Sequence, residues 1–192
     1  MDKSVLPLFL FPKVGWWQEA IRAGNFILEV SERWVKQSER SRFDIAGPNG
    51  RQSLSIPTVK KTRTILNEVE ISYDDKWDVL HWRSLETAYN RSPYFEFYKD
   101  DIQAIFEARH TRLVDLSLDA LIWCNKALGT DLKMEQSVEY SVDYRNDFRK
   151  SHFDAENHAY YQVFHDRNEF LPNLSILDVL CNCGPEALSM IR

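Results

Sequence analysis

Glycine and proline are scarce in this sequence, which contains six glycines and seven prolines among 192 residues. A fold made of many short strands needs frequent tight turns, so this scarcity disfavours a β-sandwich or a β-barrel. Neither glycine-rich phosphate loop, G-x-G-x-x-G or G-x-x-x-x-G-K-[ST], occurs in the chain. The familiar nucleotide-binding folds that depend on these loops are therefore excluded.

Cysteine pairs, long apolar runs and an excess of basic residues are also missing. Three cysteines without a CxxC pair predict neither a disulfide framework nor a zinc site, so we expect no metal. No run approaches the roughly 18 apolar residues of a membrane span. The short run at 5–11 contains a proline and leads into Lys13, so we interpret it as a buried strand of a cytoplasmic protein rather than a signal peptide. The net charge of −5 and the shortness of the basic stretch Lys60–Arg63 argue against a nucleic-acid partner.

The order of apolar runs predicts an α/β fold in a single domain, 1–192. A strand at 5–11, a helix from Val14 to a cap at Gly24 and a strand at 26–30 predict a βαβ unit with parallel strands. We expect this unit to belong to a small mixed sheet, followed by a mainly helical C-terminal half.

The remaining patterns divide the domain into four parts. The α/β part, 1–75, also contains a predicted hairpin, 42–46 with 52–57, around the turn signal Gly47–Gly50, and a short strand at 69–71. The helical part, 76–129, has helices from about Trp77 to Ser92, over 94–108 and over 109–128. We expect a variable polar loop at 130–158, then a strand at 159–164, a helix at 174–183 and a last helix from Pro185.

Ligands of a parallel sheet gather beyond the carboxyl ends of its strands, which here means near Phe11–Trp16 and Glu29–Gln37. The second strand leads into a charged segment that contains Glu29, Glu32, Lys36, Gln37, Arg40 and Arg42. Arginine pairs in a bidentate manner with carboxylates and phosphates, so these cations could clamp an anionic substrate. The same charges are equally compatible with a solvated surface loop.

A histidine in an aromatic-rich helix is the second candidate. His81 shares a helix face with Trp77 and Leu85, and a histidine can act as acid or base near neutral pH. The alternative is a core histidine among aromatic core residues. The polar residues near the chain's end, Asn173, Ser175 and Asp178, are typical of a helix start, where they satisfy free backbone N–H groups.

Several stretches of the chain resemble the WbqC-like family of bacterial proteins, which is associated with O-antigen and other surface-polysaccharide loci. The resemblance is carried by Phe11-Pro12 with the aromatic pair at 16–17, by Trp77-x-x-x-His81-Trp-Arg-Ser-Leu, by Phe170-x-Pro-Asn-Leu-Ser-Ile-Leu-Asp178 and by Gly184-Pro-Glu. Many members have a His-Gln-Pro type sequence at the end of the first strand and an Asp-rich turn after the second. This chain instead has Leu8–Pro12 and the two carboxylates Glu29 and Glu32.

The resemblance implies a group-transfer enzyme that moves an amino-acid or acyl-type group to a sugar or nucleotide-sugar precursor of a surface polysaccharide. In this hypothesis His81 is the acid or base and Glu29 or Glu32 assists it. Substrate contacts are expected from Lys36, Gln37, Arg40, Arg42, Trp16, Trp77, Arg83, Tyr94 and Gln162. The alternative is a non-catalytic cytoplasmic binding or scaffold protein that associates with itself or with biosynthetic enzymes. The residues indicate no particular cofactor.

Overall fold

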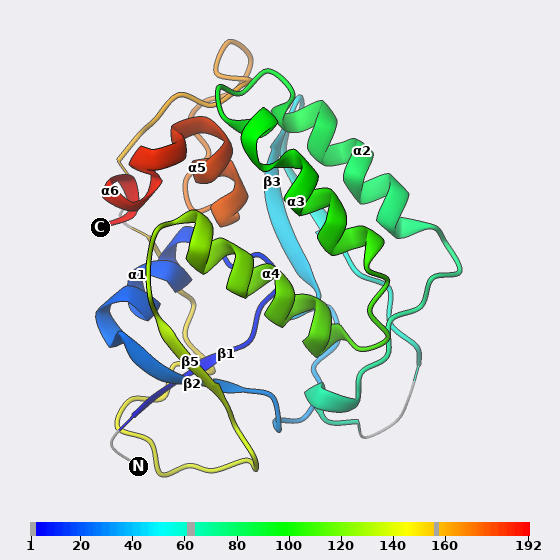
Figure 1. Ribbon diagram of the computed structural model, residues 1–192, viewed down its shortest axis with the longest axis vertical. Helices are drawn as coiled ribbons and strands as arrows, with labels where there is room; N and C mark the ends of the chain where they lie inside the picture. The colour runs from blue at the N-terminus through cyan, green and yellow to red at the C-terminus, as the bar shows by residue number, and fades with distance from the viewer. Residues whose placement is uncertain (1–2, 61–63, 156–157) are drawn as a thin grey trace.

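The parallel strands at the N-terminus form as the sequence predicts. The computed structural model describes residues 3–60, 64–155 and 158–192, so the basic stretch at 60–63 lies outside the described residues except for Lys60. Strand β1 (Ser4–Pro7) pairs in parallel with β2 (Asn25–Glu29), and helix α1 (Val14–Ala23) connects them (Figure 1). The predicted βαβ unit is therefore confirmed.

The segment expected to be a variable loop, 130–158, contributes to the sheet at both edges. Its residues Lys133–Gln136 form strand β5, which pairs in parallel with β2 and gives the strand order β1-β2-β5. Farther along, the segment lies against the other edge, where Phe148 N–H donates to the Val5 carbonyl at 2.9 Å. The strand was not predicted because its four residues, Lys-Met-Glu-Gln, lack an apolar alternation.

The hairpin is separate from the parallel sheet. Strands β3 (Arg42–Gly47) and β4 (Gly50–Ser55) pair antiparallel around Pro48 and Asn49, as the turn signal predicts. Gly50 has a φ of 103°, which favours glycine. The residues predicted as a strand at 69–71 form isolated bridges only, from Glu70 to Arg112 and from Ile71 to Thr58.

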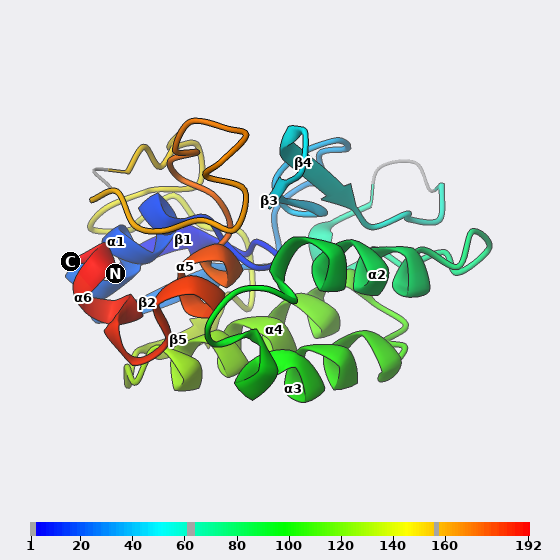
Figure 2. The ribbon, with the colours of Figure 1, turned by 90° about the horizontal axis from the view of Figure 1, so that it is seen from above.

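Three helices cover the hairpin and the core from one side (Figures 1 and 2). They are α2 (Trp77–Tyr89), α3 (Phe95–Glu107) and α4 (Leu113–Ala127), and neighbours along the chain pack against each other. A short 3-10 turn, η1 (Leu66–Glu68), contacts α4. The helical part of the prediction is confirmed.

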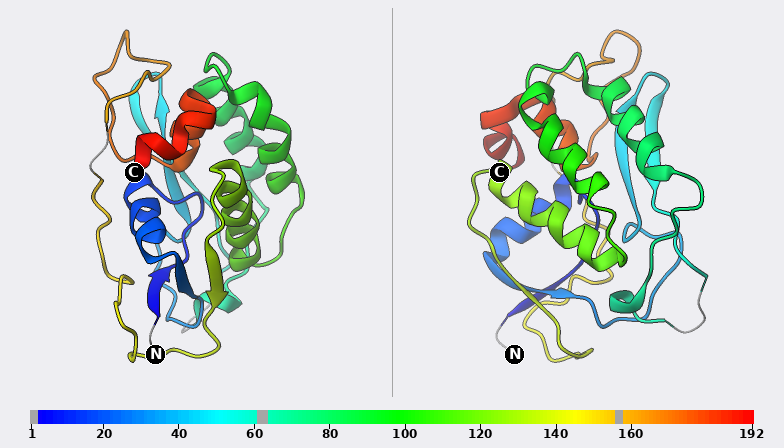
Figure 3. Two further views of the ribbon diagram at one scale, coloured as in Figure 1. Left: turned by 60° about the vertical axis from the view of Figure 1, so that its left-hand side comes forward. Right: turned by 45° about the vertical axis from the view of Figure 1, so that its right-hand side comes forward.

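The C-terminal helices lie between the parallel sheet and the hairpin. Helix α5 (Ile176–Cys183) contacts α2, α3 and β3, and after the 3-10 turn η2 (Gly184–Glu186) helix α6 (Ala187–Ile191) contacts α1 (Figure 3). Buried aromatic side chains fill the space between these elements. Trp16, for example, is fully buried, stacks edge-on against Phe26 at 5.8 Å and donates from Nε1 to the Pro7 carbonyl at 2.9 Å.

The predicted strand at 159–164 is wrong. Residues 159–162 have no regular secondary structure and 163–167 form a turn, and the buried side chain of Gln162 holds this segment together. Its Nε2 donates to the Leu171 carbonyl at 3.0 Å, and its Oε1 accepts from the Leu171 N–H at 2.9 Å. The side-chain amide of Gln162 thus bonds to both backbone polar groups of Leu171, as a neighbouring strand would do. Within the described ranges, no helix is both long enough and apolar enough to cross a bilayer.

Candidate functional site

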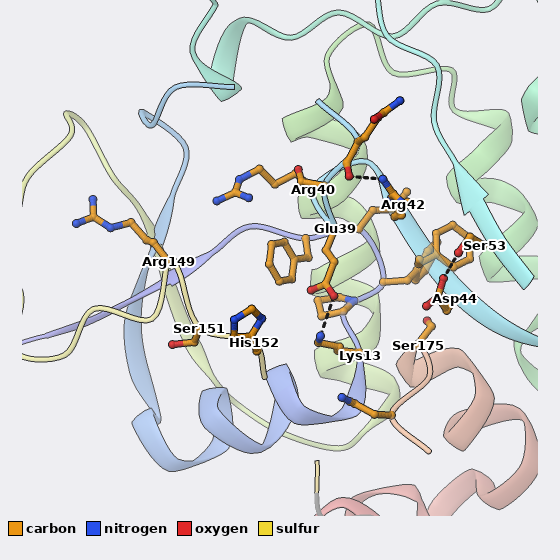
Figure 4. Close-up of a pocket in the computed structure, with 18 of the residues that line it drawn as sticks. Lys13, Glu39, Arg40, Arg42, Asp44, Ser53, Arg149, Ser151, His152 and Ser175 are labelled. Atoms are coloured by element: carbon orange, nitrogen blue, oxygen red, sulfur yellow. Dashed lines mark hydrogen bonds and ion pairs between the residues drawn. The ribbon is translucent and has the colours of Figure 1, made fainter. Parts of the chain in front are cut away.

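A pocket of about 630 Å³ lies beyond the carboxyl ends of β1 and β2 (Figure 4). This is the location at which the strand order predicts a ligand. Five chain segments supply its walls: the residues after β1, the loop after β2, the hairpin, the end of the 130–158 segment and the approach to α5. The polar lining residues are Lys13, Gln37, Ser38, Glu39, Arg40, Arg42, Asp44, Ser53, Arg149, Lys150, Ser151, His152, Asn173 and Ser175.

The lining is basic and its floor is aromatic. Lysine and arginine occupy five of the lining positions, against two carboxylates, Glu39 and Asp44. The rings of Phe9, Phe11 and Phe43 also line the pocket and are almost fully buried. A concave, partly apolar site with a few convergent polar groups is the usual form of a small-molecule site.

Arg149 is the most firmly held of the lining cations. Its Nη1 lies 2.8 Å from the Glu29 carboxylate and its Nη2 lies 2.6 Å from Asp147, and its side chain is only 3% exposed. The guanidinium also lies over the rings of Tyr140 and Tyr144, at 4.3 and 5.3 Å. The hydrogen bond from Arg149 holds the pKa of the Asp147 carboxyl below its ordinary value.

Glu29, predicted as a catalytic helper, instead joins three loops. It is fully buried at the end of β2 and accepts from Arg149, from the Ser31 N–H at 2.8 Å and from the Ser137 hydroxyl at 2.6 Å. These three donors connect Glu29 to the loop after β2, to the end of β5 and to the loop that carries Arg149. Its geometry fits a structural role behind the pocket wall.

Most other charges of the pocket are paired as well. Lys13 bonds to Glu39 at 2.7 Å, and Arg40 bonds at 2.7 Å to Glu32, the second predicted carboxylate helper. Arg42 differs, because its guanidinium donates to the Gln37 carbonyl and no carboxylate lies within 4.0 Å of it in the part of the chain that the structure describes. Arg42 is therefore a half-buried cation without a countercharge.

The backbone around the pocket is strained. Phe11, Gln37 and Asn173 line it with φ values of 43°, 56° and 55°, and Phe153, next to His152, has a φ of 52°. A side chain at positive φ costs on the order of 1–3 kcal/mol, and such residues concentrate at functional sites. These four account for most of the non-glycine residues at positive φ, which points to this pocket rather than another part of the molecule.

Asn173 ties the strained segments together. Its Oδ1 accepts from the Gly15 N–H at 3.0 Å, and its Nδ2 donates to the Phe153 carbonyl at 2.8 Å. The Phe153 carbonyl lies so close to Gly15 that a Cβ on this glycine would be 2.1 Å from it. The loop that carries Arg149 and His152 is thus fastened to the first turn of α1.

Two helices begin at the pocket. Lys13 is the N-cap of α1, and Ser175 is the N-cap of α5, where its hydroxyl accepts from the Leu177 N–H at 3.3 Å. The positive ends of both helix dipoles therefore add to the basic character of the site. Next to the start of α5, where Ser175 N–H donates to the Asp44 carbonyl at 2.9 Å, the Ser53 hydroxyl donates to the Asp44 carboxylate, which also pairs with Arg51 at 3.0 Å.

The structure does not bring His81 to this pocket. It is 7% exposed and packs among the rings of Trp77, Phe43 and Phe106, at 5.2 to 6.4 Å. Burial lowers its pKa to about 4, so the side chain is neutral near pH 7. Its Nδ1 has no hydrogen-bond partner among the described residues. This is the core histidine that the sequence left open as the alternative.

The other predicted substrate contacts divide into two groups. Gln37, Arg40 and Arg42 line the pocket. The remaining residues lie outside the lining. Trp16, Trp77 and Gln162 are buried, and Tyr94 packs on Gly184. Lys36 and Arg83 are exposed. Gln162 bonds to the buried Asp178 at 2.8 Å and to the Leu171 backbone, so its role in the structure is to join its own segment to α5 and to the residues before it.

Some lining residues were missed by sequence reasoning. Lys13 lies within Phe11–Trp16, the stretch that the strand-end argument indicated, although it was not singled out there. The residues Arg149–His152 had no such signal, because only the folded chain brings them beside β1. His152 is an exposed imidazole at the pocket and is thus the histidine positioned to transfer protons there.

The described residues contain no group of three or more His, Cys, Asp or Glu side chains that could hold a metal ion. The pocket's own polar groups are cations, hydroxyls, amides, two carboxylates and one imidazole.

One comparison with known proteins identifies the family of the chain. The model of the WbqC-like protein family matches residues 9–151 and 144–190. The chain belongs to the WbqC-like protein family. It is also similar to an uncharacterized protein, Rv1507c, of Mycobacterium tuberculosis strain H37Rv, at 26% identity over 205 residues, which covers 88% of this chain and 87% of the relative. No solved structure matches the chain significantly.

Proposed function

We propose that this WbqC-like protein binds an anionic sugar or nucleotide-sugar precursor in its basic pocket and transfers an amino-acid or acyl-type group to it during surface-polysaccharide biosynthesis, in the cytoplasm. The observation that carries the proposal is the meeting of five lysine and arginine side chains at one pocket beyond the parallel strand ends. A volume of about 630 Å³ suits a ligand of this size.

The roles divide between binding and proton transfer. Arg42 and Lys150 are the cations free to hold the anionic group, while Arg40 and Gln37 shape the wall beside them. In the transfer, an amine or hydroxyl of the sugar attacks the acyl carbon of an activated donor such as a thioester. The bond to the thiol leaving group breaks, and His152 carries the proton from the attacking atom to the leaving group.

A non-catalytic binding protein is the second candidate, and one observation favours it. The carboxylates predicted to assist catalysis, Glu29 and Glu32, are both engaged by arginines, and no carboxylate pairs with His152 in the described ranges. An imidazole without such a partner lacks the orientation that dedicated acid–base histidines usually have.

Binding and turnover distinguish the two candidates. Isothermal titration with sugar phosphates, sugar acids and nucleotide-sugars should find a ligand whose affinity falls at least about tenfold in Arg42→Gln, the loss of roughly one charged hydrogen bond. Arg22→Gln is the matched control, since Arg22 is an exposed arginine of α1 outside the lining.

Mass spectrometry of the sugar after incubation with acyl thioesters tests the transfer. His152→Gln should slow product formation and leave the dissociation constant unchanged. Arg42-dependent binding without product from any donor would favour the binding protein over the transferase, and the absence of any ligand would contradict both.

A further inference from the structure

The charge balance of the pocket limits the chemical class of ligand that it can bind. Around the cavity, Glu39, Glu32 and Asp44 each have their own lysine or arginine partner, and Arg149 is shared by Glu29 and Asp147. Within the described residues, Arg42 and Lys150 are the lining lysine and arginine side chains without a carboxylate in ion-pair distance. The pocket therefore offers a small net positive charge rather than an open polycationic surface.

The groups that usually cradle phosphates are already in use. At the start of α1, Val14 N–H donates to the Leu174 carbonyl at 3.1 Å and Gly15 N–H donates to Asn173. At the start of α5, Ile176 N–H donates to the Pro12 carbonyl at 3.0 Å and Leu177 N–H donates to Ser175. Phosphate sites at helix ends rely on free N–H groups at these positions. Here a pyrophosphate would find none.

Arg42 presents a planar donor fork instead. One of its nitrogens, Nη2, is held by the carbonyl of Gln37, a residue kept at a φ of 56°. The Nε and Nη1 N–H groups have no acceptor among the described residues, and together with the second N–H of Nη2 they leave one two-donor edge of the guanidinium free. A held guanidinium with a free edge matches the two coplanar oxygens of a carboxylate.

Hydrogen-bond acceptors gather at the end of the pocket beside Arg42. Arg42 and Asp44 are two positions apart on β3, so their side chains share one face of the strand, about 7 Å apart along it. Figure 4 shows Asp44, Ser53 and Ser175 gathered at this end, with Arg149, Ser151 and His152 at the opposite end. Carboxylate and hydroxyl oxygens here suit the hydroxyl or amino groups of a ligand.

From these contacts we infer that the anionic group bound by Arg42 is a single carboxylate, on a molecule whose neighbouring hydroxyl or amino groups face Asp44. Sugar acids and amino acids share this chemistry, and the polar lining at both ends of the cavity favours a sugar acid. The inference rests on the proposed function only in taking this pocket as the substrate site. Within that function, it makes the acceptor an acidic sugar rather than a nucleotide-sugar held by its pyrophosphate.

Isothermal titration of the full chain with a matched probe set tests this. The probes are glucuronate, glucose, glucose-6-phosphate, UDP-glucose and glycine, and the variants are Arg42→Lys and Arg22→Lys. We expect glucuronate to bind and glucose not to bind. Arg42→Lys keeps the charge and removes the fork, so it should weaken glucuronate binding at least about tenfold, whereas Arg22→Lys should leave it unchanged. Thermal unfolding of each variant verifies that it is folded.

The outcomes separate the inference from the proposed function. Binding of glycine in place of glucuronate, with the same loss in Arg42→Lys, supports the carboxylate and identifies the amino acid as its source. Tighter binding of glucose-6-phosphate or UDP-glucose than of glucuronate, or equal glucuronate affinity in Arg42→Lys and the parent, overturns the inference and leaves the proposed function standing. If none of the probes binds the folded parent chain, both fail.

Discussion

The guanidinium of Arg149 lies 2.8 Å from the carboxylate of Glu29, across 120 positions of the sequence and with both side chains almost fully buried. This pair connects the end of β2 to the loop that forms one wall of the pocket. Losing one partner of a buried ion pair leaves the other charge uncompensated, which is costly in free energy.

Glu29→Gln should therefore lower the free energy of unfolding by about 3 kcal/mol, toward the lower end of the range for broken buried pairs because Asp147 still pairs with Arg149. Urea unfolding monitored by tryptophan fluorescence measures the change. Glu19→Gln removes an ion pair in which Arg22 is largely exposed and serves as the control, with little expected change. Equal losses in the two variants would contradict the importance of the buried pair.

The stability of the protein should decrease between about pH 6.5 and pH 4 because of His81. Burial lowers its folded pKa to about 4, although nearby Asp78 acts in the opposite direction, so the unfolded chain binds the proton more readily within this window. The contribution is fully present above the unfolded pKa and is lost as the pH falls through the window. By pH 4 the loss should reach roughly 3 kcal/mol.

The slope of unfolding free energy against pH checks this expectation. His81→Leu should flatten the slope between pH 6.5 and 4, because the variant has no group there to protonate. His165→Leu, at an exposed histidine, should keep the parent slope. A parent slope that persists in His81→Leu would show that another group is responsible.

Gly15→Ala should disturb the pocket from behind. Its new Cβ would meet the Phe153 carbonyl, a backbone atom that cannot move away without shifting the loop that carries His152. We expect a loss of about 1–3 kcal/mol in unfolding free energy together with weaker ligand binding. Gly129→Ala is the comparison, because it introduces strain at a positive φ where no atom lies within 4 Å. A smaller loss for Gly15→Ala than for Gly129→Ala would be incompatible with the close approach.

Gln162→Ala should reduce stability without changing ligand affinity. The variant loses three hydrogen bonds from a side chain that is 4% exposed, to the Leu171 backbone and to Asp178. Unpaired buried groups cost about 1–3 kcal/mol, so a loss of this order is expected in chemical unfolding. Unchanged affinity for the pocket's ligand would agree with the position of Gln162 outside the lining. A selective loss of affinity at full stability would instead restore its predicted role in binding.

The elements predicted correctly are those with a turn signal or an apolar pattern in their own residues. The hairpin follows from the turn at 47–50, and α1 and β2 follow from apolar spacing and from Gly24. Strand β5 gave no such signal, since it is a short polar edge strand that is stabilised by pairing with β2. The segment at 159–164 was wrongly predicted to be a strand, because the side chain of Gln162 satisfies the Leu171 backbone groups that a strand would otherwise pair.

The same distinction holds for the site. The strand-end argument located the pocket and three of its predicted residues, Gln37, Arg40 and Arg42. It could not name Arg149, which is held by Glu29, or His152, whose neighbour Phe153 is packed against Gly15. His81 was chosen because imidazole can act as an acid or base, but its aromatic neighbours bury it away from the pocket. The residue type alone did not reveal this burial.

The polar segment that flanks both edges of the parallel sheet also ends in a wall of the pocket. Its attachment points are β5, the contact of Phe148 with Val5 and the Asn173 bridge to Phe153. A relative could exchange the few side chains between these anchors and present new groups to the cavity, while the hairpin and helices stayed as they are. The exposed side chains at 150–152 can thus change without releasing any of these anchors, whereas Arg149 is fixed by its ion pairs with Glu29 and Asp147.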